Sequence, residues 1–238
     1  MTVLTPKQRL LATISGFALS LTLTPAALAQ VTITDAQTSA VQTDGEDTTI
    51  ETTGSITIED AGPSLILNSD NALVNQGSIS ITDIDNATGL ELQGGPARSF
   101  TNSGVISLLE SSTLEDIDED GIADGAFAEG TGRTGILISG ASPFEGNIEL
   151  EAGSNISVQG NDSFGINLNN TVMAQEGLTG NLSNAGTIGI IGDNSTAINI
   201  ASNINGDFTN TGAIQAQGLN AQGVNVDADI QGLSLIHI

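Results

Sequence analysis

Apolar and polar residues alternate in short runs along most of the chain, and one such run recurs in nearly the same form. The run NQGSISI at 75–81 returns as NSGVISL at 102–108, NAGTIGI at 184–190 and NTGAIQA at 210–216. Aliphatic side chains two positions apart lie on one face of a β-strand, and the polar side chains between them lie on the other. The pattern therefore predicts strands with one buried face, each introduced by an Asn-x-Gly turn.

Two further runs accompany each Asn-x-Gly run, so the repeating unit has three arms. The second arm is another alternating run, such as GINL at 165–168 or GVNV at 223–226. The third arm begins with a glycine and precedes the next Asn-x-Gly, as at Gly180 and Gly206, which are 26 residues apart. Three short strands and three turns per period describe one coil of a solenoid.

The period predicts an all-β fold, a right-handed parallel β-helix of about six or seven three-strand coils over residues 51–232. Coils about 4.8 Å apart would give a rod of roughly 30 Å. The recurring Asn75, Asn102, Asn184 and Asn210 are expected to stack as a side-chain ladder between coils. A β-sandwich also uses short alternating strands, but it does not require one motif to return in the same order at a fixed period.

The beginning of the chain differs from the repeat. Residues 1–29 have the features of a cleaved secretory signal peptide, with Lys7 and Arg9 ahead of an apolar stretch and a small-x-small cleavage site at 27–29. The apolar stretch is too short for a transmembrane anchor. Residues 30–50 are expected to form an N-terminal cap or a flexible lead-in.

Residues 233–238 also depart from the repeat. By alignment on Gly206, another Asn-x-Gly should follow Gly232, but the chain reads LSLIHI. A solenoid needs a capping coil at its end for solubility, and no polar capping coil follows here. This tail is therefore predicted to be a truncation or a sequence artefact, in an N-terminal fragment of a longer protein.

The chain is strongly acidic. It has 28 Asp and Glu residues against 4 Lys and Arg residues, and its formal net charge is −24 at pH 7. Nucleic acid is excluded as a partner, because phosphate binding needs a basic surface. After residue 29 the only Lys or Arg residues are Arg98 and Arg133, which we interpret as solvated turn residues. The absence of Cys argues against a small disulfide-stapled domain.

An acidic insertion at about 109–131 interrupts the repeat and contains a loop with the pattern of a calcium site. Alternate carboxylates and one carbonyl can converge on a hard cation there, and Gly121 allows the sharp turn that the loop needs. The predicted ligands are Asp116, Asp118, Asp120, Ile122 and Asp124. Phe127 stands where an EF-hand has its bidentate Glu, so Glu129 or water would complete the site and the affinity should be modest. The loop resembles those of thrombospondin type 3 and dockerin repeats; the alternative is an acidic surface loop without metal.

The leader, the Asn-x-Gly-x-Ile coils, the lack of Cys and the acidic balance together resemble the passenger region of bacterial autotransporters. Filamentous-haemagglutinin-like adhesins share the same style of coil, and the resemblance covers residues 30–232. It implies export through the periplasm to the outer membrane, the cell surface or the extracellular space. It also implies a C-terminal β-barrel translocator, which this chain does not contain, and host or surface proteins or polysaccharides as partners.

Three functions are compatible with such a rod. The first is an adhesin or surface-interaction rod, with the insertion as the natural place for specificity, because loops on a scaffold carry function. The second is a passive stalk that displays a downstream domain. The third is a polysaccharide-degrading β-helix enzyme, whose sites, as family resemblance implies, combine carboxylates with Arg, Lys or His. Basic residues are scarce and Trp and Tyr are absent, so we expect no enzyme, although a carboxylate pair for glycoside hydrolysis stays open.

Overall fold

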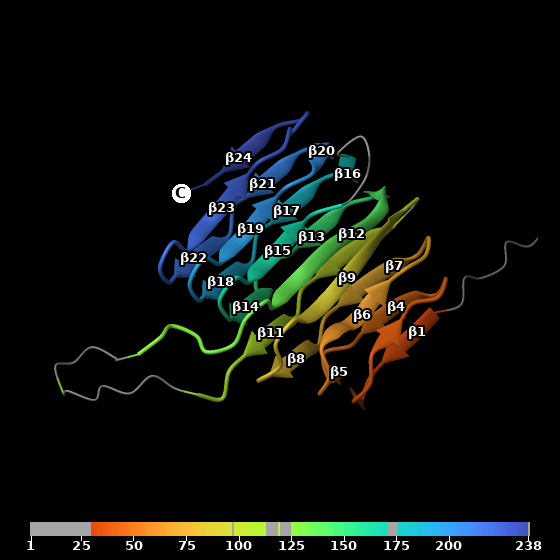
Figure 1. The fold of residues 1–238 in the computed structure, drawn as a ribbon. Helices are drawn as coiled ribbons and strands as arrows, with labels where there is room; N and C mark the ends of the chain where they lie inside the picture. Colours follow the sequence, from red (N-terminus) through yellow and green to blue (C-terminus); the bar gives the residue numbers. More distant parts are fainter. Residues whose placement is uncertain (1–29, 97, 113–118, 120–124, 171–175, 238) are drawn as a thin grey trace, which may run out of the picture.

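The computed structural model describes residues 30–96, 98–112, 119, 125–170 and 176–237. Over these residues the protein is all-β, and three parallel sheets wrap around one continuous apolar core (Figure 1). This arrangement confirms the predicted parallel β-helix. The described residues contain no helix that could cross a membrane.

The strands of successive coils lie next to one another in each sheet. The first sheet contains, in order, β1 (Gln30–Ile33), β4 (Asp47–Ile50), β7 (Ala72–Asn75), β10 (Ser99–Asn102), β13 (Ile148–Leu150), β17 (Leu182–Asn184), β21 (Phe208–Asn210) and β24 (Ser234–Ile236). The second sheet contains β2 (Ala36–Gln37), β5 (Ser55–Thr57), β8 (Ser78–Thr82), β11 (Val105–Leu109), β14 (Asn155–Gln159), β18 (Thr187–Ile191) and β22 (Ala213–Gln217).

The third sheet has seven strands in one row and two further strands beside that row. It contains β3 (Val41–Gln42), β6 (Gly62–Leu67), β9 (Ala87–Gly95), β12 (Thr134–Glu145), β15 (Phe164–Leu168), β19 (Thr196–Ile200) and β23 (Gln222–Val226). Beside the end of β12 lie β16 (Glu176–Thr179) and β20 (Asn203–Asn205), which pair with each other. They directly precede Gly180 and Gly206, whose runs, the third arm of the repeat, form β17 and β21 in the first sheet.

Within the described residues the chain passes seven times through the first, second and third sheets, and β24 then adds one more strand to the first sheet. Residues 30–50, expected as a cap or flexible lead-in, contain β1 to β4. In the off-pattern tail, Ser234–Ile236 pairs in register with β21. Strands of these sheets therefore lie beyond both limits of the predicted repeat, as β1 to β4 before it and as β24 after it.

The core consists of rows of aliphatic side chains that run along the axis of the rod. In the second sheet, Ile79, Ile106, Ile156 and Ile188 stand in register on consecutive strands, and each is fully buried. A single coil would leave such a row open to water, whereas stacking buries it between neighbouring coils. Burial contributes about 25 cal/mol per Å² of apolar surface, which makes stacking the main source of stability.

The predicted stacking of asparagine amides is confirmed, in two separate pairs. Asn75 Nδ2 donates to Asn102 Oδ1 at 2.7 Å, and Asn184 Nδ2 donates to Asn210 Oδ1 at 2.6 Å. All four side chains are buried at the ends of first-sheet strands. Leu150 occupies the same row between Asn102 and Asn184 and divides the ladder.

The glycine of the Asn-x-Gly turn is required by the close approach of successive coils. A Cβ on Gly104 would lie 2.2 Å from the carbonyl oxygen of Gly77, and one on Gly212 would lie 2.0 Å from that of Gly186. Neither Gly104 nor Gly212 has a positive φ, whereas left-handed backbone occurs at other turns, for example at Asn194 (φ 55°) and Asn220 (φ 59°) between the second and third sheets.

Candidate functional site

The predicted calcium ligands Asp116, Asp118, Asp120, Ile122 and Asp124 lie outside the described residues. No group of three or more His, Cys, Asp or Glu side chains that could hold a metal ion occurs in the part of the chain that is described. The structure does place the base of the insertion, namely residues 109–112, where the chain leaves β11, and 125–133, where it returns to β12.

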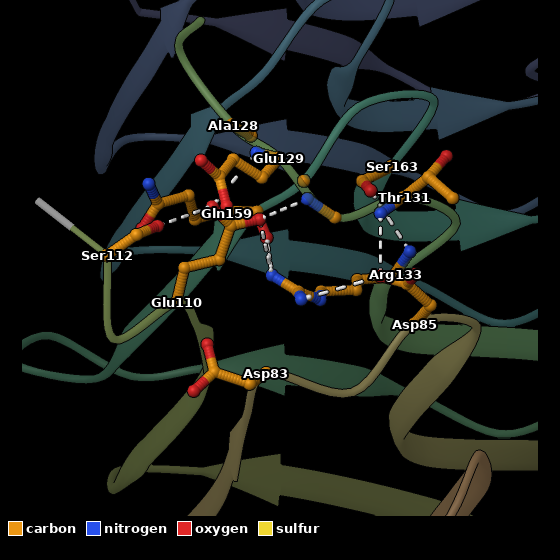
Figure 2. A network of polar contacts seen from close by, with 12 residues as sticks. Asp83, Asp85, Glu110, Ser112, Ala128, Glu129, Thr131, Arg133, Gln159 and Ser163 are labelled. Atoms are coloured by element: carbon orange, nitrogen blue, oxygen red, sulfur yellow. Dashed lines mark hydrogen bonds and ion pairs between the residues drawn. The ribbon is translucent and has the colours of Figure 1, made fainter. Parts of the chain in front are cut away.

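A buried ion pair joins the two sides of this base. Arg133 Nη1 lies 3.0 Å from Glu110 Oε1, and the two side chains are 2 % and 4 % exposed (Figure 2). Asp85 Oδ1 lies 3.5 Å from Arg133 Nη2, but the Asp85 side chain is 53 % exposed. Water screens an exposed carboxylate, so Glu110 is the main counter-charge of the guanidinium.

The same guanidinium also connects neighbouring coils. Its Nε donates to the Ile84 carbonyl at 2.8 Å, and its Nη1 donates to the Gln159 carbonyl at 2.6 Å. Ile84 lies between β8 and β9, and Gln159 ends β14. Arg133 therefore ties the coil that carries the insertion to the coils on both sides of it.

Glu110 holds the returning backbone of the insertion as well as the guanidinium. Its Oε1 accepts from the Gly130 amide at 2.6 Å, and its Oε2 accepts from the Glu129 amide at 3.0 Å. Asp85 Oδ1 accepts from the Thr131 amide at 2.9 Å. Carboxylates that accept amide hydrogen bonds make strong, charge-assisted contacts. The base of the insertion is thus fixed by side chains from two coils.

The next coil also contacts the segment that returns from the insertion to β12. Gln159 Nε2 donates to the Phe127 carbonyl at 3.3 Å, and Asn161 Nδ2 donates to the Ala128 carbonyl at 2.9 Å. Residues 127–133 therefore have backbone contacts on both sides along the rod axis.

An open acidic hollow of about 410 Å³ lies at this base. It is lined by Asp83, Asp85, Glu110, Ser111, Ser112, Glu129, Gly130 and Arg133. The Ser111 hydroxyl donates to Asp83 Oδ2 at 2.6 Å and the Ser111 amide donates to Oδ1 at 2.8 Å, and these bonds hold the pKa of Asp83 below its ordinary value. Four carboxylates and one guanidinium line the hollow, so its charge favours cationic groups.

Arg98 is buried too, but it has a different set of partners. It is 8 % exposed, and its Nη atoms donate to the carbonyls of Asn68 at 2.9 Å, of Gly94 at 3.0 Å and of Gln93. Burial lowers the pKa of Arg98, and the charge of Asp70 opposes that shift. The interpretation of Arg98 and Arg133 as solvated turn residues was wrong, because both guanidinium groups close corners of the solenoid.

Sequence reasoning did not find the pair of Glu110 and Arg133. A usable clue was present, because Glu110 directly follows the last strand before the insertion and Arg133 directly precedes the next one. Opposite charges that flank an insertion can meet where the chain leaves and rejoins the same coil. The abundance of acidic residues hid this relation.

Comparison with family models, with curated proteins and with solved structures finds no match to the chain. Function is therefore inferred from the fold and from the surface around the insertion.

Proposed function

We propose that the protein is an exported β-helical surface rod of the autotransporter-passenger type, which contacts its targets through the insertion on its side and is not an enzyme. The observation that carries this proposal is the buried pair of Glu110 and Arg133 at the base of the insertion. Desolvating two charges is costly, and such a pair is favourable only with close geometry and further hydrogen bonds. A base of this kind fixes the points at which the chain leaves the rod for the insertion and returns to it.

The surface beside the insertion supports a contact role. The outward face of the second sheet has a hollow of about 660 Å³, bordered by Leu109 and Ile191 and floored partly by Gly189, which has no side chain. Leu109 is also the last residue of β11 before the insertion. A target held by the insertion would therefore meet this apolar surface at the same time.

A binding comparison tests the proposal. The chain from Gln30 onward is applied to immobilised surface proteins and polysaccharides, together with a variant in which residues 113–124 are replaced by a Gly-Ser linker of the same length. We expect the linker variant to lose binding. The matched control, Asn199→Ala with Asn225→Ala, alters the outward face of the third sheet and should bind like the parent. Equal binding by the parent and the linker variant would contradict the role of the insertion, and no binding by either would favour a passive stalk.

We also propose that the loop at 116–125 binds calcium. The alternating carboxylates support this site, and an affinity in the range of extracellular modules, about millimolar, is expected. Titration calorimetry on the parent and on Asp118→Ala with Asp120→Ala tests it. Heat from the parent alone supports the site, and the absence of heat from the parent at saturating calcium would contradict it.

Export is proposed from the leader at residues 1–29, with the outer membrane, cell surface or extracellular space as the destination. A C-terminal β-barrel translocator and host or surface macromolecules are the proposed partners. Expression of the full chain in a bacterial host, followed by N-terminal sequencing of the periplasmic product, tests export. A mature chain that begins at Gln30 is expected, and an unprocessed cytoplasmic chain would contradict it.

A further inference from the structure

One glycine lies inside a strand at a position where the fold does not require it. Gly189 is the central residue of β18, in register with Ser157 on β14 and with Gln215 on β22. The alternation of the three strands places these residues outside the core. A glycine weakens the interior of a strand, and it often marks a bulge, a tight bend or a place where a ligand approaches the backbone closely.

Neither a bulge nor a bend explains Gly189. Its strand pairs in continuous register with both neighbours, and Gly189 has no positive φ. Steric need does not explain it either. A Cβ on Gly189 would lie 4.0 Å from the carbonyl oxygen of Ile156 and would meet nothing closer among the described residues. By contrast, a Cβ on Gly186, in the turn before the same strand, would lie 2.1 Å from Ser154 Oγ. The close approach of a ligand is the explanation that remains.

The space over Gly189 is the hollow of about 660 Å³ on the outward face of the second sheet, which we call the Gly189 groove. None of the described residues that line it is charged, and two of them, Leu109 and Ile191, are 40 % and 37 % exposed. Val105, which is 38 % exposed, lies on the same face. The strands β14 and β18 have a neighbour on both sides. The groove is therefore an apolar recess in the side of the rod, with room for a large side chain.

The Gly189 groove adjoins the acidic hollow at the base of the insertion. Leu109 lines the groove, and the next residue, Glu110, lines the acidic hollow. The guanidinium of Arg133 is already paired with the buried Glu110. Asp83 and Glu129, which also line the hollow, have no ion-pair partner among the described residues. A ligand that places an apolar group in the groove can therefore place a cation beside unpaired carboxylates.

We propose that the Gly189 groove and the acidic hollow together form a docking site for an extended basic segment of a partner protein. A large apolar side chain lies over Gly189, and a neighbouring Lys or Arg side chain enters the acidic hollow. This inference rests on the proposed contact role of the rod and names the chemistry of its partner. A neutral polysaccharide could occupy the groove but would gain nothing from the carboxylates, and the chain has a formal net charge of −24. Charge complementarity therefore favours the basic segment.

Fluorescence anisotropy with labelled hexapeptides tests the docking site on the chain from Gln30 onward, which contains every described coil. The probe is Gly-Phe-Gly-Lys-Lys-Gly, and two matched probes replace Phe with Ala or both Lys residues with Glu. We expect saturable binding of the first probe and binding of each matched probe that is about tenfold weaker or more. Added salt should weaken the binding of the first probe, because it screens the contacts of exposed charges.

Gly189→Val fills the groove and should weaken binding of the first probe about tenfold. A β-branched side chain suits a strand, and the Cβ meets no close contact, so resistance of the variant to urea should equal or exceed that of the parent. The control Ser80→Val adds the same side chain to the same outward row outside the groove and should bind like the parent. Asp83→Asn with Glu129→Gln should weaken binding and reduce its dependence on salt.

Failure of the parent to bind the first probe would overturn the docking site, and so would equal binding of the Lys and Glu probes. Displacement of the probe by maltohexaose at lower concentrations than by unlabelled peptide would also overturn it, in favour of a polysaccharide. The variant with a Gly-Ser linker at 113–124 should still bind the probe, because the lining residues named above lie outside that stretch. The peptide assay can therefore fail while the insertion still proves necessary for binding surface macromolecules, and the reverse result is equally distinct.

Discussion

Arg133 and Arg98 are both buried at corners of the solenoid, yet they are neutralised in different ways. Arg133 pairs with the buried Glu110 and also donates to two carbonyls. Arg98 donates to three carbonyls and forms no ion pair within the described residues. Arg133 lies where a long insertion leaves and rejoins the coil, whereas Arg98 lies at a corner without such an insertion.

The two guanidinium groups have different partners because the backbone differs at the two corners. At the Arg98 corner, three carbonyl groups of the neighbouring backbone are sufficient acceptors for the guanidinium. At the Arg133 corner the ends of the insertion must be held together, and a carboxylate on one end can bind both the guanidinium and the amides of the other. The ion pair therefore accompanies the insertion and is not a general requirement for burying Arg in this fold.

The largest expected effect comes from Arg133→Met, which removes the charge but keeps an apolar stem. It leaves Glu110 buried without its partner, and loss of one member of a buried pair costs about 3–5 kcal/mol. Urea unfolding measures the free energy of unfolding. Circular dichroism monitors the transition, because the chain has no Trp or Tyr. Limited proteolysis should also cut the insertion faster. A smaller loss of unfolding free energy than that caused by Arg98→Met would contradict this comparison of the two corners.

Glu110→Gln should have a smaller effect of roughly 2 kcal/mol, the scale of hydrogen bonds to charged groups. The amide oxygen of Gln can still accept from the Gly130 backbone, and Asp85 still lies near the guanidinium. A double-mutant cycle with Arg133→Met isolates the coupling between the two side chains. Strictly additive effects would show that the pair does not act as a unit.

Arg98→Met should cost less, about 1–2 kcal/mol, because it leaves carbonyl groups without a donor but no buried carboxylate without a counter-charge. The same urea experiment measures it, and the insertion should remain as resistant to protease as in the parent. Faster cleavage within the insertion would mean that the two corners are coupled, and it would contradict their independent roles.

The smallest effect is expected at the rim of the acidic hollow. Ser111→Ala removes the hydroxyl that donates to Asp83, so the pKa of Asp83 should rise toward its ordinary value of 3.8. A carboxyl with a lowered folded-state pKa stabilises the fold above its unfolded pKa, and this contribution is lost as the pH falls through the folded pKa. The free energy of unfolding of the variant should therefore be lower than that of the parent at neutral pH and equal to it in strong acid. Carbon NMR titration of Asp83 measures the shift; an unchanged pKa would contradict the assignment.

The repeat itself could be predicted because its physical cause is local. Alternation places Ile79 and Ile81 on one face of a strand, and a fixed period brings the same residue types back to the same place in each coil. The amide pairs of Asn75 with Asn102 and of Asn184 with Asn210 follow from that register. The break at Leu150 was visible only once the strands were paired, because its turn does not have the Asn-x-Gly form.

The sequence by itself determined the coil, its three strands and the position of the one long insertion, since these depend on alternation and period along the chain. Only the tertiary structure decided that Glu110 meets Arg133 and that both arginines are buried. These features depend on distances between residues far apart in the chain. Charge and hydrophobicity along a sequence do not specify such distances until the coils are stacked.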